Sequence, residues 1–234
     1  MWQGRFYRNI PVIANDHPTA RWILLTLTTR NCDVDDLREQ IQKMNQAWKK
    51  MTQRKEMKPV KGWIRTTEVT RGKDGSAHPH FHILIMAPSN MLAGKNYVKH
   101  ARWVEMWREC LGVNYDPNVD VRAIKTPKNA TEEERVDALK GAVRETLKYA
   151  TKAQDAIDDN EWFLHMVEQT HRLRFIASGG VLKDILREDE EENDDLIAGE
   201  NDEETEEKER KIAFKWWQND MYRRAKNKDI LPEE

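Results

Sequence analysis

Two histidines in a short apolar segment are the residues in this sequence best suited to chemistry. The segment 78–86 reads HPHFHILIM, and its β-branched and aromatic content is typical of a strand. Residues two apart on a strand share a face, so His80 and His82 would point together while Phe81 and Ile83 point to the opposite side. Two imidazoles on one face can bind a metal ion. The alternative is a pair of half-exposed strand residues with no ligand role.

A carboxylate on the preceding predicted strand could complete this site. Asp74-Gly75 is a strong turn signal between the two strands, which indicates a β-hairpin. A turn centred on Asp74 would place Glu68 opposite His80, and a turn centred on Gly75 would place it opposite His82. Two histidines and one carboxylate leave open positions on a divalent cation, Mn²⁺ or Mg²⁺, for a substrate oxygen. Otherwise Glu68 is an ordinary strand carboxylate.

A predicted helix over residues 131–152 carries the remaining reactive groups. Glu145, Tyr149 and Lys152 fall on one stripe with Ala142, about 140° from the apolar stripe at 100° per residue. The apolar stripe consists of Val136, Leu139, Val143, Leu147 and Ala150. A phenol with a pKa near 10 is a poor nucleophile unless its anion is stabilised or its target is polarised. A bound metal and a neighbouring lysine would supply that help.

These candidates must be positioned by an α+β domain around a mainly antiparallel sheet. Hydrophobic periodicity predicts strands at 21–29, 62–70, 80–86 and 119–124. It predicts helices at 33–52, 97–111, 131–152 and 157–169, the third opened by a Thr131/Glu134 capping box. Segment 172–187 is mixed, and 208–228 reads as a basic helix that carries Trp216 and Trp217.

Composition excludes several classes of protein. The chain has 234 residues, of which 38% are hydrophobic and 34% charged. Its apolar runs, such as 82–87, are far shorter than the roughly 20 residues of a membrane span, and its start lacks a signal peptide's apolar stretch. Two cysteines, Cys32 and Cys110, do not form a disulfide scaffold or a Cys-ligated zinc motif. We therefore expect a soluble cytoplasmic protein without a membrane partner.

The formal net charge of −2 hides a strong segregation of charge. Residues 188–209 contain 14 of the 41 acidic residues and one of the 39 basic residues, which leaves 38 basic and 27 acidic residues elsewhere, a net charge of +11. Such acidic blocks are normally disordered. We expect a catalytic domain at 1–187, an acidic linker at 188–209 and a basic, aromatic helix at 210–234. A basic globule favours a nucleic-acid ligand.

Three motifs in order resemble the HUH endonuclease superfamily. They are the His80-Phe81-His82 strand, the upstream Leu25-Thr-Leu-Thr28 segment, and the stretch from Glu145 to Lys152 that contains Tyr149. A single tyrosine paired with a glutamate four residues earlier is similar to one group of plasmid rolling-circle replication initiators (Rep proteins). Segment 169–180 also looks Rep-like, so the resemblance covers about residues 20–185.

The resemblance implies a fold and a reaction. The fold would be a five-stranded antiparallel sheet of ferredoxin-like (RRM-like) type, with flanking helices. Tyr149 would attack the scissile phosphate of single-stranded or hairpin origin DNA, giving a 5′-phosphotyrosine and a free 3′-OH. Glu68, His80 and His82 would hold Mg²⁺ or Mn²⁺.

The resemblance also assigns the remaining residues and partners. Glu145 would activate water or otherwise assist the second cleavage, and Lys152 would orient the phosphate or the phenolate. A host helicase and polymerase would be further partners in a bacterial or other prokaryotic host. A relaxase or transposase of the same superfamily is an alternative within the class.

Two other functions fit the same residues. A metal-dependent phosphodiesterase could use bound water as its nucleophile, in which case Tyr149→Phe would remain active. A non-catalytic origin-binding module would bind DNA and cleave nothing. A covalent protein–DNA adduct distinguishes the tyrosine mechanism from both.

Overall fold

The computed structural model describes residues 2–125, 130–146, 159–183, 214–217 and 221–224. The chain forms two compact units, Met1–Asp194 and Asp195–Glu234. The candidate residues belong to the first unit, and each unit is described by itself. Among the described residues, no helix is long and apolar enough to cross a membrane.

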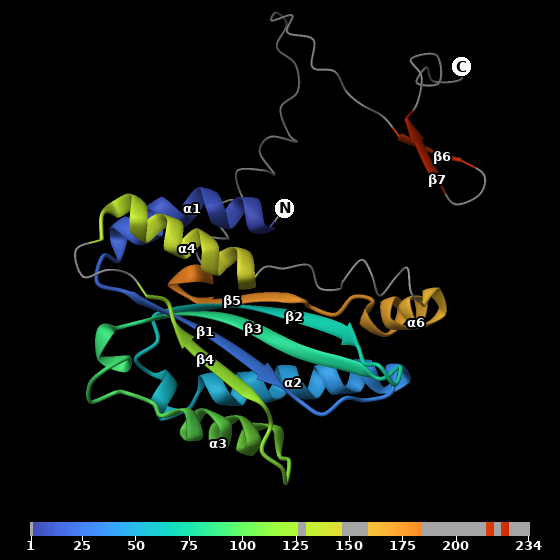
Figure 1. Ribbon diagram of the computed structural model, residues 1–234, viewed down its shortest axis with the longest axis horizontal. Coiled ribbons are helices and arrows are strands. Elements are labelled where there is room, and N and C mark those ends of the chain that lie inside the picture. The colour runs from blue at the N-terminus through green and yellow to red at the C-terminus, as the bar shows by residue number, and fades with distance from the viewer. Residues whose placement is uncertain (1, 126–129, 147–158, 184–213, 218–220, 225–234) are drawn as a thin grey trace, which may run out of the picture. The chain divides into compact units, whose positions relative to one another are not determined.

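A five-stranded antiparallel sheet forms the centre of the first unit (Figure 1). The strand order is β4-β1-β3-β2-β5, so the chain's β2–β3 hairpin occupies the middle and β4 and β5 form the edges. This arrangement confirms the predicted α+β class. The strands are β1 (Arg21–Thr28), β2 (Gly62–Arg71), β3 (Ala77–Ala87), β4 (Val119–Ala123) and β5 (Ile176–Gly180).

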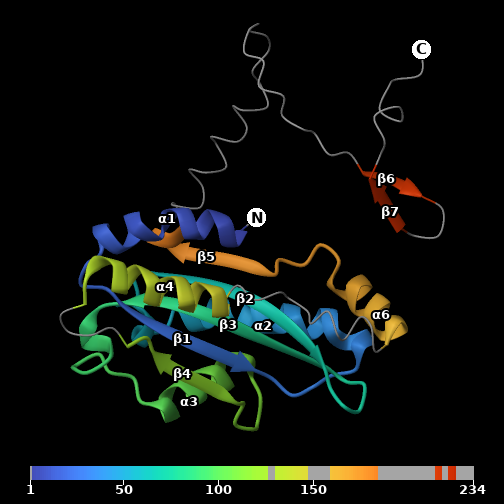
Figure 2. The same cartoon turned by 45° about the horizontal axis from the view of Figure 1, so that its top comes forward.

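Helices cover both faces of the sheet (Figures 1 and 2). Helices α2 (Leu37–Thr52) and α3 (His100–Leu111) lie on one face, and α1 (Trp2–Asp16) and α4 (Glu132–Thr146) pack together on the other. Helix α6 (Asn160–Thr170) packs against α2 and against the 3₁₀ turn Val34–Asp36, which directly precedes α2. Two further 3₁₀ turns are Lys55–Met57 and Ser89–Met91.

Strand β3 separates two of the three hydrophobic clusters of the described residues by alternation. Phe81 and Ile83 lie in the core beneath α2 and α3, with the buried Trp103 and Trp107. Leu84 and Met86 lie in the core beneath α1 and α4. Because even-numbered residues of β3 share this second face, the predicted histidine pair lies on the α4 side of the sheet.

The turn of the β2–β3 hairpin determines the register of the central strands. The Asp74 carboxylate accepts hydrogen bonds from the backbone N–H and hydroxyl of Ser76, and Gly75 adopts φ = 83°. Glycine tolerates this left-handed conformation without steric cost. The resulting ladder pairs Glu68 with His80, as expected for a turn centred on Asp74.

Helix α4 begins at the predicted capping box. The Thr131 hydroxyl accepts a hydrogen bond from the Glu134 backbone N–H at 3.2 Å, and the Glu134 carboxylate accepts one from the Thr131 N–H at 2.9 Å. Leu139, Val143 and also Ala142 are buried in the core beneath the helix. The predicted separation of the Ala142 stripe from the packed face is therefore wrong at Ala142. The small alanine side chain lets that arc of the helix approach the sheet.

Two further segments add to what the sequence predicts, and a third lies outside the described residues. Helix α1 was not predicted; it contains Pro11, and its buried Ile10 and Ile13 give only a short apolar signal. The mixed segment 172–187 contains the edge strand β5. The acidic segment 188–209 lies outside the described residues, so the linker remains a prediction.

The predicted C-terminal helix over 210–234 is wrong at the residues that the structure describes. Strands β6 (Phe214–Trp217) and β7 (Met221–Arg224) form an antiparallel pair in the second unit. The pairing sets Trp216 opposite Tyr222. The aromatic residue types of this segment favour strands, and this propensity outweighs the helical spacing of its apolar residues.

The capping box gives a direct test of how α4 is anchored. We expect Thr131→Ala to destabilise the protein by about 1 kcal/mol, because one N-terminal backbone N–H loses its acceptor. For a chain of this size, the melting temperature should fall by roughly 2–4 °C in thermal unfolding followed by circular dichroism. Thr131→Ser, which keeps the hydroxyl, should melt like the wild type. An unchanged melting temperature in Thr131→Ala would contradict the cap's contribution.

Candidate functional site

Glu68, His80 and His82 converge at the centre of the sheet on the α4 side. Their candidate ligand atoms lie within 4.8 Å of one another. Glu68 Oε2 lies 3.2 Å from His80 Nε2 and 2.7 Å from His82 Nε2. The side chains are 13%, 12% and 19% exposed, respectively. The site is thus mostly shielded from water and still accessible to a small ligand.

The second nitrogen of His80 shows that this site needs a positive centre. His80 Nδ1 lies 3.2 Å from the backbone carbonyl of His78, which can only accept a hydrogen bond. The proton of a neutral His80 therefore sits on Nδ1, and the lone pair of Nε2 faces the Glu68 carboxylate. Two acceptors at this distance repel each other unless a proton or a cation lies between them. The donor set therefore fits a divalent metal ion.

His82 is held from the neighbouring strand. Its Nδ1 lies 3.3 Å from the hydroxyl of Thr26 on β1, and the ladder pairs the same two residues. Metal-binding histidines commonly have such a partner on their second nitrogen, which fixes the ring orientation. Thr26 was part of a motif in the sequence, but its contact depends on the register between strands 56 residues apart.

Electrostatics keep the Glu68 carboxylate ionised. Its burial alone would raise the pKa, but when His80 and His82 are protonated, their hydrogen bonds and positive charge outweigh burial and lower the pKa well below its usual range. Burial, together with the charge of His80, lowers the pKa of His78. His78 Nδ1 is 2.6 Å from the side-chain oxygen of Asn31, and the His78 ring lies 5.2 Å from the His80 ring.

The end of α4 is tied to the same face of the sheet. The hydroxyl of Thr66 on β2 donates a hydrogen bond to the Thr146 carbonyl, and Thr66 pairs with His82 on the ladder. Thr146 is buried and its own hydroxyl bonds the Ala142 carbonyl at 2.9 Å. The last described turn of α4 therefore lies beside the histidine pair. No local sequence pattern predicts this hydrogen bond, because Thr66 and Thr146 are 80 residues apart in the chain.

The structure does not describe the side chains of Glu145, Tyr149 and Lys152, the three reactive residues predicted on the helix. The backbone of Glu145 belongs to α4, immediately before Thr146, but its side chain lies outside the described residues. Tyr149 and Lys152 also lie outside the described residues. Their roles therefore remain predictions.

A small cavity separates the end of α4 from strands β1, β3 and β4. Both His82 and Thr146 line it, as does the Asp120–Arg122 ion pair on β4, whose atoms are 2.6 Å apart. The remaining lining residues are Leu24, Leu25, Thr26 and Ile83. The cavity gives the α4 side of the site a polar wall at the sheet edge.

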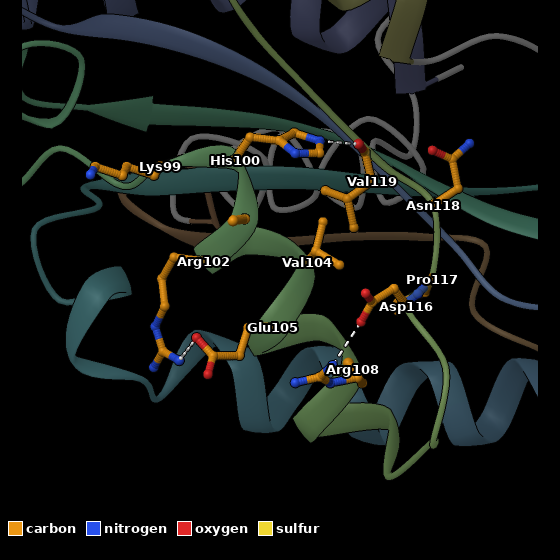
Figure 3. A pocket seen from close by; sticks show the side chains of 11 residues that line it. Lys99, His100, Arg102, Val104, Glu105, Arg108, Asp116, Pro117, Asn118 and Val119 are labelled. Carbon is orange, nitrogen blue, oxygen red and sulfur yellow. Dashed lines mark hydrogen bonds and ion pairs between the residues drawn. The ribbon is translucent and has the colours of Figure 1, made fainter.

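A larger hollow, about 680 Å³, lies along α3 and the loop before β4 (Figure 3). Both of its arginines form ion pairs: Arg102 contacts Glu105 at 2.7 Å, and Arg108 contacts Asp116 at 2.8 Å. His100 Nε2 lies 2.8 Å from the Val119 carbonyl. None of the three residues of the candidate metal site lines this hollow, so it contributes nothing to their chemistry.

Comparison with known proteins identifies the family of this chain. A family described as replication protein matches residues 1–223. A replication protein from Staphylococcus aureus and one from Bacillus sp. are each 34% identical over 223 residues, which is 90% of this chain and 93% of theirs. A protein named Rep from Streptococcus pneumoniae is 32% identical over 209 residues, 86% of this chain and 63% of its own. No solved structure matches. The chain therefore belongs to the replication protein (Rep) family.

Proposed function

We propose that this protein initiates plasmid rolling-circle replication by nicking and rejoining single-stranded origin DNA through Tyr149. It would be an HUH-type tyrosine endonuclease that acts as DNA nickase and strand transferase. The observation that carries the proposal is the convergence of Glu68, His80 and His82 on the face to which the end of α4 is bonded. Membership of the replication protein family supports it.

The three converging side chains would hold a divalent cation, Mn²⁺ or Mg²⁺. His80 Nε2, His82 Nε2 and Glu68 Oε2 are the atoms that face one another, so they are the proposed ligands. When bound, the cation would neutralise charge on a phosphate oxygen and make the phosphorus a better electrophile. Three protein ligands leave room for that oxygen.

The proposal requires Tyr149 to come close to this site, and the chain length allows it. Thr146 is fixed to β2 through Thr66, and Tyr149 follows three residues later. Three trans peptides span at most about 11 Å between Cα atoms, a length that, together with a tyrosine side chain, would let the phenol meet a phosphate held beside His82.

The proposed step needs no co-reactant. The Tyr149 phenolic oxygen forms a bond to the scissile phosphorus, and the bond from phosphorus to the 3′ oxygen breaks. The phenol loses its proton and the departing 3′ oxygen gains one, which leaves a 5′-phosphotyrosine and a free 3′-OH. In this proposal Lys152 orients the phosphate or phenolate, and Glu145 activates the water that ends a round.

The proposed substrate is single-stranded or hairpin DNA at a plasmid origin. The net charge of +11 outside residues 188–209 supports a polyanionic ligand. The relatives named replication proteins support a role in replication, with a host helicase and polymerase as partners in the bacterial cytoplasm.

The tyrosine mechanism predicts a covalent adduct. Purified protein with Mn²⁺ and single-stranded oligonucleotides carrying a cognate origin should give an adduct that survives denaturation and carries the downstream fragment. We expect Tyr149→Phe to form none, because it lacks the attacking oxygen. Tyr97→Phe, which changes an exposed tyrosine on the chain segment before α3, should form the adduct normally. Cleavage without an adduct, retained in Tyr149→Phe, would instead indicate a phosphodiesterase with a water nucleophile.

The proposed ligand set predicts a specific loss of metal binding. In isothermal titration with Mn²⁺, Glu68→Gln should weaken binding by more than about a hundredfold, since loss of a second-shell partner alone costs 10–100-fold. EDTA should abolish adduct formation by the wild type. Glu133→Gln, which removes an exposed carboxylate from the first turn of α4, should bind Mn²⁺ like the wild type. Equal affinities of the two variants would rule out Glu68 as a ligand.

The link between β2 and α4 predicts a defect in catalysis without a defect in metal binding. Thr66→Val should slow adduct formation on the order of fivefold, the equivalent of one hydrogen bond of about 1 kcal/mol. Its Mn²⁺ affinity should stay unchanged. Thr67→Val is the matched control, because the Thr67 hydroxyl is buried without a partner among the described residues. If both variants react at the wild-type rate, the link does not position the helix for reaction.

A further inference from the structure

We propose that Thr26 is a positioning residue that holds the His82 imidazole with Nε2 directed at the bound cation. This inference rests on the metal site of the proposed function. It assigns a physical role to a side chain that is not one of the three proposed ligands. The argument depends on which partner each imidazole has on its second nitrogen.

The contact follows from the central ladder of the sheet. Strand β1 lies between β3 and β4, and Thr26 pairs directly with His82. Directly opposed residues share a face of the sheet. The Thr26 hydroxyl oxygen is consequently 3.3 Å from His82 Nδ1, on the opposite side of the ring from the 2.7 Å contact to Glu68. The imidazole is held at both nitrogens.

A hydroxyl suits this position because it can both donate and accept. Without a cation, the short contact between His82 Nε2 and the Glu68 carboxylate requires a proton on Nε2. In a neutral ring Nδ1 then accepts from Thr26. With a cation on Nε2, the proton sits on Nδ1, and the Thr26 hydroxyl oxygen accepts a hydrogen bond from this N–H. Threonine or serine satisfies both arrangements, whereas valine satisfies neither.

His80 does not depend on a side chain in this way. Its Nδ1 faces the backbone carbonyl of His78, which no side-chain substitution removes. Thr28, which pairs with His80, donates its hydroxyl to the Asn118 carbonyl at 2.9 Å. Two threonines on one face of β1 therefore have different roles, and Thr28 provides a matched control for Thr26.

The experiment measures Mn²⁺ affinity of the full chain by isothermal titration for wild type, Thr26→Val, Thr26→Ser and Thr28→Val. We expect Thr26→Val to weaken binding by about tenfold, the low end of the cost of losing a second-shell partner. Thr26→Ser and Thr28→Val should bind like the wild type. Thermal unfolding of each variant, followed by circular dichroism, checks that the sheet is intact.

Each outcome separates this inference from the metal site itself. If the wild type binds Mn²⁺ and Thr26→Val binds equally well, Thr26 does not position His82 and the metal site stands. If Thr28→Val or Thr26→Ser weakens binding as much as Thr26→Val, the effect belongs to strand packing and the inference fails. A wild type that binds no Mn²⁺ would overturn the metal site and, with it, this role for Thr26.

Discussion

The register of the β2–β3 hairpin is the constraint on which the candidate site depends. Side chains alternate between the two faces of a strand, so a slip of one residue would move every side chain to the opposite face. The turn at Asp74 and Gly75 instead pairs Glu68 with His80 and brings His82 against the same carboxylate. The same register places Phe81 in the α2–α3 core. The β2–β3 ladder thereby determines both the packing of the core and the grouping of the three candidate side chains.

The α4 face of β3 combines two environments along a single strand. Leu84 and Met86 are buried beneath α1 and α4, where apolar burial stabilises the packing of both helices on the sheet. His80 and His82 continue the same row but remain partly exposed; Thr26 and a backbone carbonyl are the partners of their Nδ1 atoms, and their Nε2 atoms face Glu68. The apolar end of the row anchors the helices, and the polar end is free to bind a ligand.

A second connection places the end of α4 beside this polar row. Thr66 is the neighbour of His82 on the ladder and bonds the Thr146 carbonyl of α4. Segments far apart in the chain thus meet at one point: β1 through Thr26, the hairpin through Glu68, His80 and His82, and α4 through Thr146. This convergence, in a chain of the replication protein family, supports the proposed metal-assisted attack on DNA.

The sequence by itself determined what depends on local spacing. It predicted the central strands, the hairpin, the capping box of α4 and the grouping of Glu68 with the two histidines, because alternation, turn chemistry and caps act over a few residues. Tertiary structure alone decided the contacts between distant segments. The pairing of Thr26 with His82, the bond from Thr66 to Thr146 and the edge strand β5 depend on strand order. The C-terminal segment forms strands at Phe214–Trp217 and Met221–Arg224, where the strand propensity of aromatic residues outweighs a helical pattern. Register between distant strands is set by packing of the whole sheet, and no local pattern contains it.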